Sequence, residues 1–305
     1  MRTIVTGGAG FIGSHIADRL LALGHDVTVV DDLSQGRREN VPVAASFALR
    51  DIASPGTADL VADLKPELVV HAAAQASVPR SIADPQHDAR TNIIGTLTLL
   101  NGVSRSGCRC FIYVTTGGAL YGDPIQLPCS ESHPVRPLSP YGLSKWTAER
   151  YLDLLADACA VRTALRLANV YGPRQRSDGE GGVVSVFLDR MRSQGTVEIH
   201  GDGEQTRDFV YVGDVVDAVV AAASAPRSLT LNIGTGVGTS VNTLFEQLAR
   251  ITGFRGKAVT APARPGDVRH SRLDASAAAR ELGWHPATDL ETGLRLTAES
   301  WGRGS

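Results

Sequence analysis

The chain has 305 residues and a mass of 32.2 kDa, which allows one extended α/β unit or two closely packed lobes. Its hydrophobic fraction of 43% and charged fraction of 20% are ordinary for a globular protein. The net charge of −2 leaves no electrostatic footprint for nucleic acid, so we expect no nucleic-acid partner.

Targeting and metal-binding patterns are also missing from the sequence. No basic and then apolar leader opens the chain, and no run of about 18 apolar residues could span a bilayer, which predicts a cytoplasmic protein with no membrane partner. The four cysteines lack the paired spacing of a zinc site and are too few for a disulfide scaffold. We therefore expect buried free thiols and no metal.

Short β-branched runs alternate with longer helical patterns in the first half of the chain. The expected strands are residues 3–5, 27–30, 47–49, 68–70 and 111–114. Helical patterns cover residues 13–23 and 88–106, and each ends at a glycine, Gly24 and Gly107. This alternation predicts an α/β fold with a doubly wound parallel sheet, the Rossmann fold.

The second half is expected to leave this sheet and come back to it. After an expected strand at 162–167, the chain enters a polar loop rich in glycine and arginine at 169–182, which we interpret as the entrance to a second, smaller α/β lobe. Two later apolar segments, 209–212 and 229–233, could return to the main sheet. The predicted domains are a cofactor domain at 1–170, with 208–238 returning to it, and a substrate lobe at 171–207 and 239–305.

A glycine-rich turn lies between the first expected strand and the first expected helix. Gly7, Gly10 and Gly13 have GxxGxxG spacing, in which backbone amides and a helix N-terminus can receive a pyrophosphate. Phe11 and Ile12 lie inside the same turn and are counted with the cofactor site. The turn predicts a dinucleotide cofactor.

Acidic residues after the next two strands suggest which dinucleotide binds. Asp31 follows Gly13 by 18 residues at the end of a strand, where a carboxylate can accept both ribose hydroxyl protons and repels a 2′-phosphate. We therefore expect NAD rather than NADP, and Asp32 is assigned to the same site. Asp51 and Ile52 follow the next strand and could face the adenine, although a surface turn fits Asp51 equally well by position alone.

A tyrosine and a lysine four residues apart suggest the chemistry. Ser139 and Pro140 are typical of a helix start, so Tyr141 and Lys145 should share one helical face. The chain has only three lysines, which makes a chance match unlikely to explain the pair. An unperturbed tyrosine has a pKa near 10, so it acts as a base at neutral pH only where cations such as Lys145 favour its phenolate.

A hydroxyl group is needed to hold the reacting oxygen. Thr115 and Thr116 end the strand at 111–114, and the carboxyl ends of parallel strands are where ligands bind. The alternative explanation of the whole set is a cofactor-sensing regulator without catalysis, which would have no need for the threonine, tyrosine and lysine together.

Taken together, these motifs resemble the extended short-chain dehydrogenase/reductases, and within them the NAD-dependent nucleotide-sugar epimerase/dehydratase family. The resemblance runs nearly end to end and includes the segments 71–78, 115–122, 169–174, 206–209 and 264–267. It implies a cofactor site along Ala72, Ala73 and Gln75. It also implies nucleotide-sugar contacts from five residues: Asn169, Val183, Arg207, Arg264 and Asp267.

The threonine segment departs from the commonest family pattern. Many epimerases carry a catalytic Ser or Thr four residues before the position of Tyr121, which is Gly117 here, so the resemblance assigns the hydroxyl to Thr116 rather than Thr115. Dehydratase members carry an acid and a base at the positions of Gly117 and Gly118. Their absence argues against dehydration of the familiar type.

The resemblance implies an NAD-dependent nucleotide-sugar 4-epimerase, an isomerase, whose expected substrate is a UDP-hexose such as UDP-glucose or UDP-galactose. Tyr141, Lys145 and Thr116 would carry the catalysis, with Tyr141 and Lys145 also touching the cofactor. Alternatives within the family are a UDP-uronate epimerase and another nucleotide-sugar dehydratase or decarboxylase. Family likeness further implies a homodimer formed by two helices per subunit, one of them bearing Tyr141.

Overall fold

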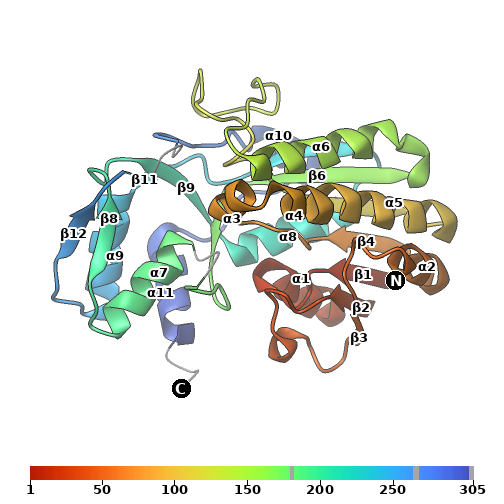
Figure 1. Cartoon of the computed structure of the whole chain (residues 1–305), viewed down its shortest axis with the longest axis horizontal. Helices are drawn as coiled ribbons and strands as arrows, with labels where there is room; N and C mark the ends of the chain where they lie inside the picture. Colours follow the sequence, from red (N-terminus) through yellow and green to blue (C-terminus); the bar gives the residue numbers. More distant parts are fainter. Residues whose placement is uncertain (179–181, 264–267, 302–305) are drawn as a thin grey trace.

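The structure is a computed structural model that describes residues 1–178, 182–263 and 268–301. A seven-stranded parallel sheet forms the larger of its two parts, with strand order β10-β6-β5-β4-β1-β2-β3 (Figure 1). Its strands are β1 (Arg2–Thr6), β2 (Asp26–Asp31), β3 (Ser46–Leu49), β4 (Leu68–His71), β5 (Cys110–Thr116), β6 (Val161–Leu167) and β10 (Leu229–Ile233). The predicted doubly wound parallel sheet is confirmed.

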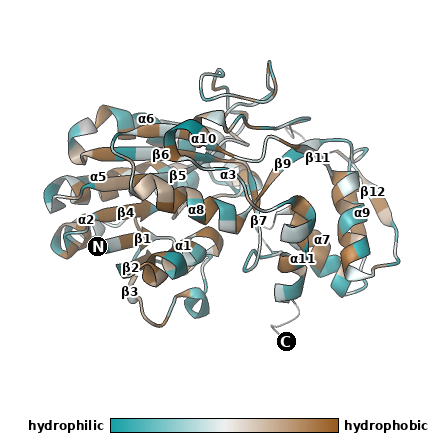
Figure 2. Ribbon diagram, turned by 180° about the vertical axis from the view of Figure 1, so that it is seen from behind, coloured by the Kyte–Doolittle hydropathy of each residue, from teal (hydrophilic) through white to brown (hydrophobic). Residues whose placement is uncertain are grey.

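Both faces of this sheet are covered by helices, because alternate side chains of each strand point to opposite faces. Val5 and Val29 pack with α1 (Phe11–Ala22) and α8 (Val212–Ala223) on one face. Ile4 packs with helices on the other face, which are α2 (Gly56–Leu64), α5 (Gly95–Ser106) and α6 (Pro140–Leu154). Figure 2 shows the result as brown, hydrophobic strands between helices of mixed colour.

The helix that carries Tyr141 and Lys145 begins where the sequence predicts. Ser139 is extended and its hydroxyl accepts a hydrogen bond of 3.1 Å from the Gly142 amide, and Pro140 occupies the first helical position. The helix α6 therefore starts one residue before Tyr141. Both predicted side chains lie in its first two turns.

The predicted helix at 88–106 starts three residues earlier and changes its pitch. Asp84 caps its first turn by accepting from the His87 amide at 3.0 Å. The helix then runs through α4 (Pro85–Ala89), a π-helical turn at Arg90–Ile94, and α5. Such π turns inside helices often occur at functional sites.

A smaller lobe lies beside the carboxyl ends of the sheet strands (Figure 1). One of its sheets is three-stranded, with order β11-β9-β7, and the other pairs β12 with β8. A separate apolar core joins β7, β8, β9 and β12 to three helices. The elements are β7 (Asn169–Tyr171), β8 (Val197–His200), β9 (Thr206–Tyr211), β11 (Gly238–Ser240), β12 (Ala258–Ala261), α7 (Val183–Arg192), α9 (Val241–Thr252) and α11 (Leu290–Trp301).

One of the two predicted returns to the main sheet is confirmed and the other is wrong. Leu229–Ile233 is the strand β10, parallel to β6. Residues 209–212 do not join that sheet: 209–211 belong to β9, which pairs with β7 and β11, and Val212 begins α8. An apolar run predicts a strand but not its partner, and here β10 already occupies the edge of β6.

A further difference concerns the end of the chain. The helix α10 (Ser276–Leu282) was expected in the smaller lobe, but its Ala278 packs in the apolar core beside α8 and β10. Trp284, just after it, is buried in the same core and donates a hydrogen bond of 2.9 Å to the Asp214 carbonyl. A short helix with one apolar face fits either part, so its sequence does not decide between them.

Two properties follow from the described residues as a set. No helix among residues 1–178, 182–263 and 268–301 is long and apolar enough to cross a bilayer. Within the same ranges, no group of three or more His, Cys, Asp or Glu side chains could hold a metal ion. The four cysteines are free and buried.

Candidate active site

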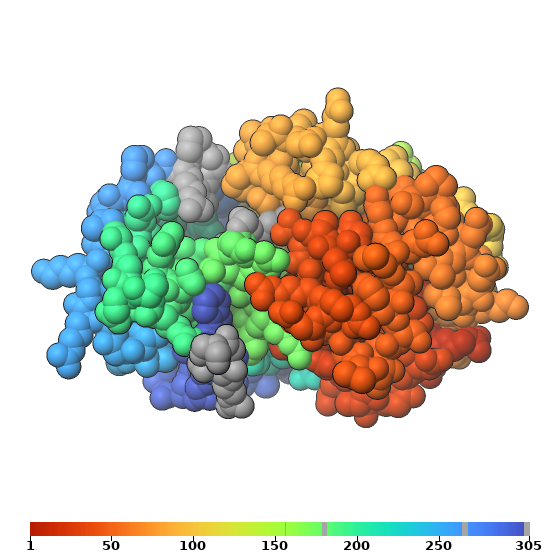
Figure 3. Space-filling model, turned by 60° about the horizontal axis from the view of Figure 1, so that its bottom comes forward, coloured from red at the N-terminus to blue at the C-terminus, as the bar shows by residue number. Residues whose placement is uncertain are grey.

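A cavity of about 960 Å³ opens at the carboxyl ends of the main-sheet strands and reaches the smaller lobe. Figure 3 shows the two parts of the molecule, red to orange and green to blue, in contact with each other. The cavity brings together most of the residues expected from the sequence: Gly7, Gly10, Phe11, Ile12, Asp31, Asp32, Asp51, Ile52, Ala72, Ala73, Thr116, Tyr141, Lys145, Asn169 and Arg207.

The glycine turn is packed so tightly that side chains cannot enter it. Gly7 has a φ of +69°, and a Cβ on it would lie 2.6 Å from the Ala73 amide nitrogen. A Cβ on Gly13 would collide with the Gly7 carbonyl oxygen, which already accepts a hydrogen bond of 3.0 Å from the Gly10 amide. This bare backbone at the start of α1 fits the pyrophosphate of a dinucleotide.

Gly13→Ala is therefore expected to weaken NAD binding by about tenfold or more, because the added methyl group must push the Gly7 backbone out of place. Calorimetric titration with NAD measures the effect. Gly56→Ala is the matched control, since a Cβ at Gly56 meets no atom within 4 Å. Equal NAD affinity for the Gly13→Ala variant and the parent would show that the turn does not hold the cofactor.

Asp31 lies at the end of β2 beside this turn. Its two carboxylate oxygens accept backbone hydrogen bonds, 3.0 Å from the Ala9 amide and 2.8 Å from the Leu33 amide. Burial raises the pKa of Asp31, and these two hydrogen bonds act in the opposite direction. Asp32 is exposed and lines the same end of the cavity.

The far end of the cavity is bounded by the residues that follow β3. The Asp51 carboxylate pairs with the Arg90 guanidinium at 2.7 Å and accepts from the Ala53 amide at 2.8 Å. Ile52 is buried next to it. Asp51 is thus a structured wall of the cavity rather than a free surface turn.

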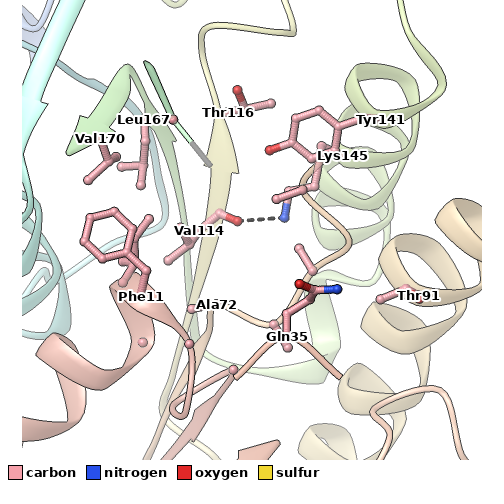
Figure 4. Close-up of a pocket in the computed structure, with 18 of the residues that line it drawn as sticks. Phe11, Gln35, Ala72, Thr91, Val114, Thr116, Tyr141, Lys145, Leu167 and Val170 are labelled. Carbon is pink, nitrogen blue, oxygen red and sulfur yellow. Dashed lines mark hydrogen bonds between the residues drawn. The ribbon is translucent and has the colours of Figure 1, made fainter. Parts of the chain in front are cut away.

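At the other end, Lys145 is buried and its ammonium group is held in place (Figure 4). Its Nζ donates a hydrogen bond of 2.8 Å to the Val114 carbonyl and lies 4.2 Å from the centre of the Tyr113 ring. Burial lowers the pKa of Lys145 to about 7, while the nearby carboxylates of Asp88 and Glu149 act against that shift.

The two hydroxyl groups expected to contact the reacting oxygen come from different elements. Thr116 ends β5 and Tyr141 lies in the first turn of α6, and both are half-buried in the wall of the cavity. Figure 4 draws the two side chains next to each other near the top of the view. The Thr116 hydroxyl accepts from the Ala119 amide at 3.2 Å. Thr115 also lines the cavity, and its buried hydroxyl has no hydrogen-bond partner.

Two expected site residues, Gln75 and Val183, are not among those that line the cavity. Gln75 is buried behind the wall of the cavity, where its side-chain amide donates a hydrogen bond of 2.7 Å to the Asp88 carboxylate. Val183 begins α7 next to Gly182, which does line the cavity. Arg264 and Asp267 lie outside the residues that the structure describes.

On the side of the smaller lobe, the cavity is bounded by β7 and β9. Asn169 is the first residue of β7 and Arg207 lies in β9. The Arg207 guanidinium donates a hydrogen bond of 2.9 Å to the Thr206 carbonyl. An amide and a guanidinium therefore face the cavity from the lobe opposite Tyr141.

In the loop that crosses from one part to the other, three residues of the cavity wall were not assigned to the site from the sequence. The cavity is lined there by Arg174, Gln175 and Arg176. The Arg176 guanidinium donates a hydrogen bond of 3.0 Å to the Gln35 carbonyl in the loop after β2. Arg174 pairs with Asp18 of α1 at 2.7 Å. The arginine-rich composition of the loop at 169–182 was the available signal.

Comparison with known proteins agrees with this geometry. Residues 3–234 match the model of the "NAD dependent epimerase/dehydratase family". The chain is 44% identical to a UDP-glucose 4-epimerase of Mycolicibacterium smegmatis, over 98% of both chains.

Two solved structures are also similar. A Thermotoga maritima UDP-glucose 4-epimerase with UDP-glucose has 47% identity and a TM-score of 0.97, covering 99% of each chain. A Thermus thermophilus UDP-glucose 4-epimerase in complex with NAD has 39% identity and a TM-score of 0.94, covering 100% of each chain. The chain belongs to the NAD dependent epimerase/dehydratase family.

Proposed function

We propose that the protein is an NAD-dependent UDP-glucose 4-epimerase. The observation that carries this proposal is one cavity that joins the glycine turn to Thr116, Tyr141 and Lys145. Its support is the full-length similarity to proteins named UDP-glucose 4-epimerase, two of which were solved with UDP-glucose or NAD.

NAD supplies the oxidation and re-reduction of the sugar carbon when it is bound. The backbone of Gly7, Gly10 and Gly13 would hold its pyrophosphate. The Asp31 carboxylate would accept hydrogen bonds from the hydroxyl groups of a ribose. The Asp51 carboxylate would lie at the adenine end. Between the glycine turn and the adenine end, the walls of the cofactor site would be formed by Phe11, Ile12, Ala72 and Ala73.

The residues around β5 and α6 would move the proton. Tyr141 takes the proton of the 4-hydroxyl group and later returns it, as a general base and then a general acid. Lys145, one helical turn away, stabilises the tyrosine phenolate with its positive charge. The Thr116 hydroxyl orients the same sugar oxygen.

The reaction inverts one carbon, so the sugar must turn over while its nucleotide stays in place. Arg207 would hold the diphosphate, because a guanidinium can bridge phosphate oxygens, and Asn169 would contact the substrate beside it. Val183, Arg264 and Asp267 remain predicted substrate contacts. The smaller lobe would thus anchor the nucleotide while the part built on the main sheet, with β5 and α6, performs the chemistry.

Position 118 supports epimerisation over dehydration. A Cβ at Gly118 would lie 3.9 Å from the Thr116 hydroxyl oxygen and 3.6 Å from the Asn169 amide oxygen, so a side chain there would face the reacting oxygen. Glycine supplies neither an acid nor a base for removing water. Nothing at this position would divert the keto sugar from re-reduction.

The proposal is tested by following the purified protein with NAD and UDP-glucose by proton NMR. We expect UDP-galactose to form until the two sugars reach equilibrium, with no change in total mass. Parallel samples contain UDP-glucuronate, UDP-N-acetylglucosamine and a dTDP-sugar. Loss of carbon dioxide or water, or inversion confined to one of these other substrates, would contradict it.

We further propose a homodimer formed by two helices per subunit, one of them α6. Large apolar side chains are exposed along α6, with 52% exposure at Leu143 and 78% at Leu154. Light scattering is expected to give twice the chain mass of 32.2 kDa, and Leu154→Glu is expected to shift the protein toward the single-chain mass. A parent mass of 32.2 kDa would refute the dimer. The cytoplasmic location stays a prediction.

A further inference from the structure

Behind the wall of the cavity, four polar side chains form a buried cluster. Asn92, in the π turn, donates through its Nδ2 to Asp88 at 3.1 Å and lies 3.0 Å from the Ser144 hydroxyl. Gln75 donates to the same Asp88 oxygen at 2.7 Å. All four residues are at most 3% exposed. The cluster joins α4 to α6 next to Lys145.

The carboxylate of Asp88 is only half satisfied within this cluster. Its Oδ1 accepts from two neutral amides, and its Oδ2 is buried with no hydrogen-bond partner. No ion pair links Asp88 to a cation within 4 Å among residues 1–178, 182–263 and 268–301. A buried carboxylate is costly unless a positive charge lies close enough to compensate it.

Lys145 is the buried cation on the adjoining helix, and most groups that face it are neutral or already paired. His71 on β4 and Tyr113 on β5 are fully buried; burial lowers the pKa of His71 and raises that of Tyr113, so both are neutral. Glu149, one turn further along α6, binds the Arg166 guanidinium at 2.5 and 3.2 Å. Its charge is therefore largely compensated.

The remaining charged or titratable groups near this end of α6 are directed to solvent. The helices packed against α6 here are α3 (Val78–Ala83), α4, the π turn and α5. Their charged or titratable side chains other than Asp88 are exposed or half-buried, namely Arg80, Asp84, His87, Arg90 and Arg105. Tyr141 is the proposed reaction partner of Lys145. This leaves Asp88 as the uncompensated negative charge near the ammonium group.

We propose that Asp88 is a positioning residue of the reaction, a buried counter-charge that keeps Lys145 protonated and locks α4 against α6. Asp88 and Lys145 attract each other across the two helices, and this attraction raises the pKa of Lys145 against the effect of burial. Without it, the pKa of Lys145 falls further, so the lysine carries less positive charge at neutral pH and stabilises the phenolate of Tyr141 less.

The test titrates Lys145 directly. The chain has three lysines, and the other two, Lys65 and Lys257, are exposed. Protein labelled with ¹³C at the lysine ε-carbons should give three signals, and Lys145→Met identifies the buried one. In Asp88→Asn we expect the titration midpoint of Lys145 to fall by about one unit, with and without NAD, while the two exposed lysines do not move.

Asp59→Asn is the matched control, because it removes one acidic charge of α2 from an exposed ion pair with Arg105 of α5. It should leave all three midpoints unchanged. If Asn at position 88 prevents folding, Asp88→Ser removes the charge and leaves room for water, and the same fall is expected. An unchanged Lys145 midpoint in a folded, uncharged variant overturns the proposal.

Because this proposal rests on the roles proposed for Tyr141 and Lys145, the readout is ionisation rather than turnover. A wrong sugar substrate would abolish the NMR reaction test but leave the lysine titration as expected. A wrong role for Asp88 would leave epimerisation intact and the midpoint unmoved.

Discussion

Tyr141→Phe is expected to lower kcat for epimerisation by about 10²- to 10⁴-fold, the range that a positioned general base contributes. The variant keeps the ring that packs in the first turn of α6 and loses only the hydroxyl that would accept the sugar proton. NAD affinity should change by less than about tenfold, because the glycine turn and Asp31 are untouched. Rates of UDP-galactose formation and calorimetric NAD titration measure the two effects.

Tyr151→Phe provides the matched control on the same helix. Tyr151 lies near the end of α6, is 38% exposed, and does not line the cavity. Its replacement should leave turnover unchanged. Full turnover by the Tyr141→Phe variant would rule out Tyr141 as the base.

Arg166→Leu is expected to lower the free energy of unfolding by about 3–5 kcal/mol, the usual effect of removing one partner from a buried ion pair. Arg166, in β6, binds Glu149 of α6, and both side chains are at most 5% exposed. Its guanidinium also donates to the Tyr121 hydroxyl at 2.9 Å and to the Glu131 carbonyl at 3.2 Å. Urea denaturation measures the loss.

Two comparison variants separate this effect from the loss of an arginine in general. Arg105→Leu breaks the exposed pair with Asp59 and should cost less than about 1 kcal/mol. The double variant Glu149→Leu/Arg166→Leu removes both charges, so it should be more stable than Arg166→Leu alone. A double variant less stable than the single one would show that the uncompensated charge is not the cause.

Local signals in the sequence predicted the part of the site that one segment builds by itself. The glycine turn, Asp31 at a strand end and the Ser139 cap before Tyr141 each depend on neighbours within a few residues, and the structure has them as expected. Asn169 and Arg207 required the family resemblance, because nothing local distinguishes them from other loop and strand residues.

Contacts between distant segments were not predictable in the same way. Gln75 was expected along the cofactor, but its amide binds Asp88, a partner 13 residues away that no spacing rule selects. The apolar run at 209–212 indicated a strand but did not indicate which sheet it joins. The π turn that places Asn92 in the buried cluster has no reliable sequence signature.

UDP-glucose deuterated at C4, incubated with the protein and NAD in ordinary water, tests for transient oxidation at C4. If one carbon is oxidised and re-reduced by the same bound NAD, NMR will find UDP-galactose with the deuterium still on C4. The Tyr141→Phe variant will form about 10²- to 10⁴-fold less of it in the same time. UDP-galactose that has lost its C4 deuterium to solvent, or no UDP-galactose at all, would contradict epimerisation by transient oxidation at C4.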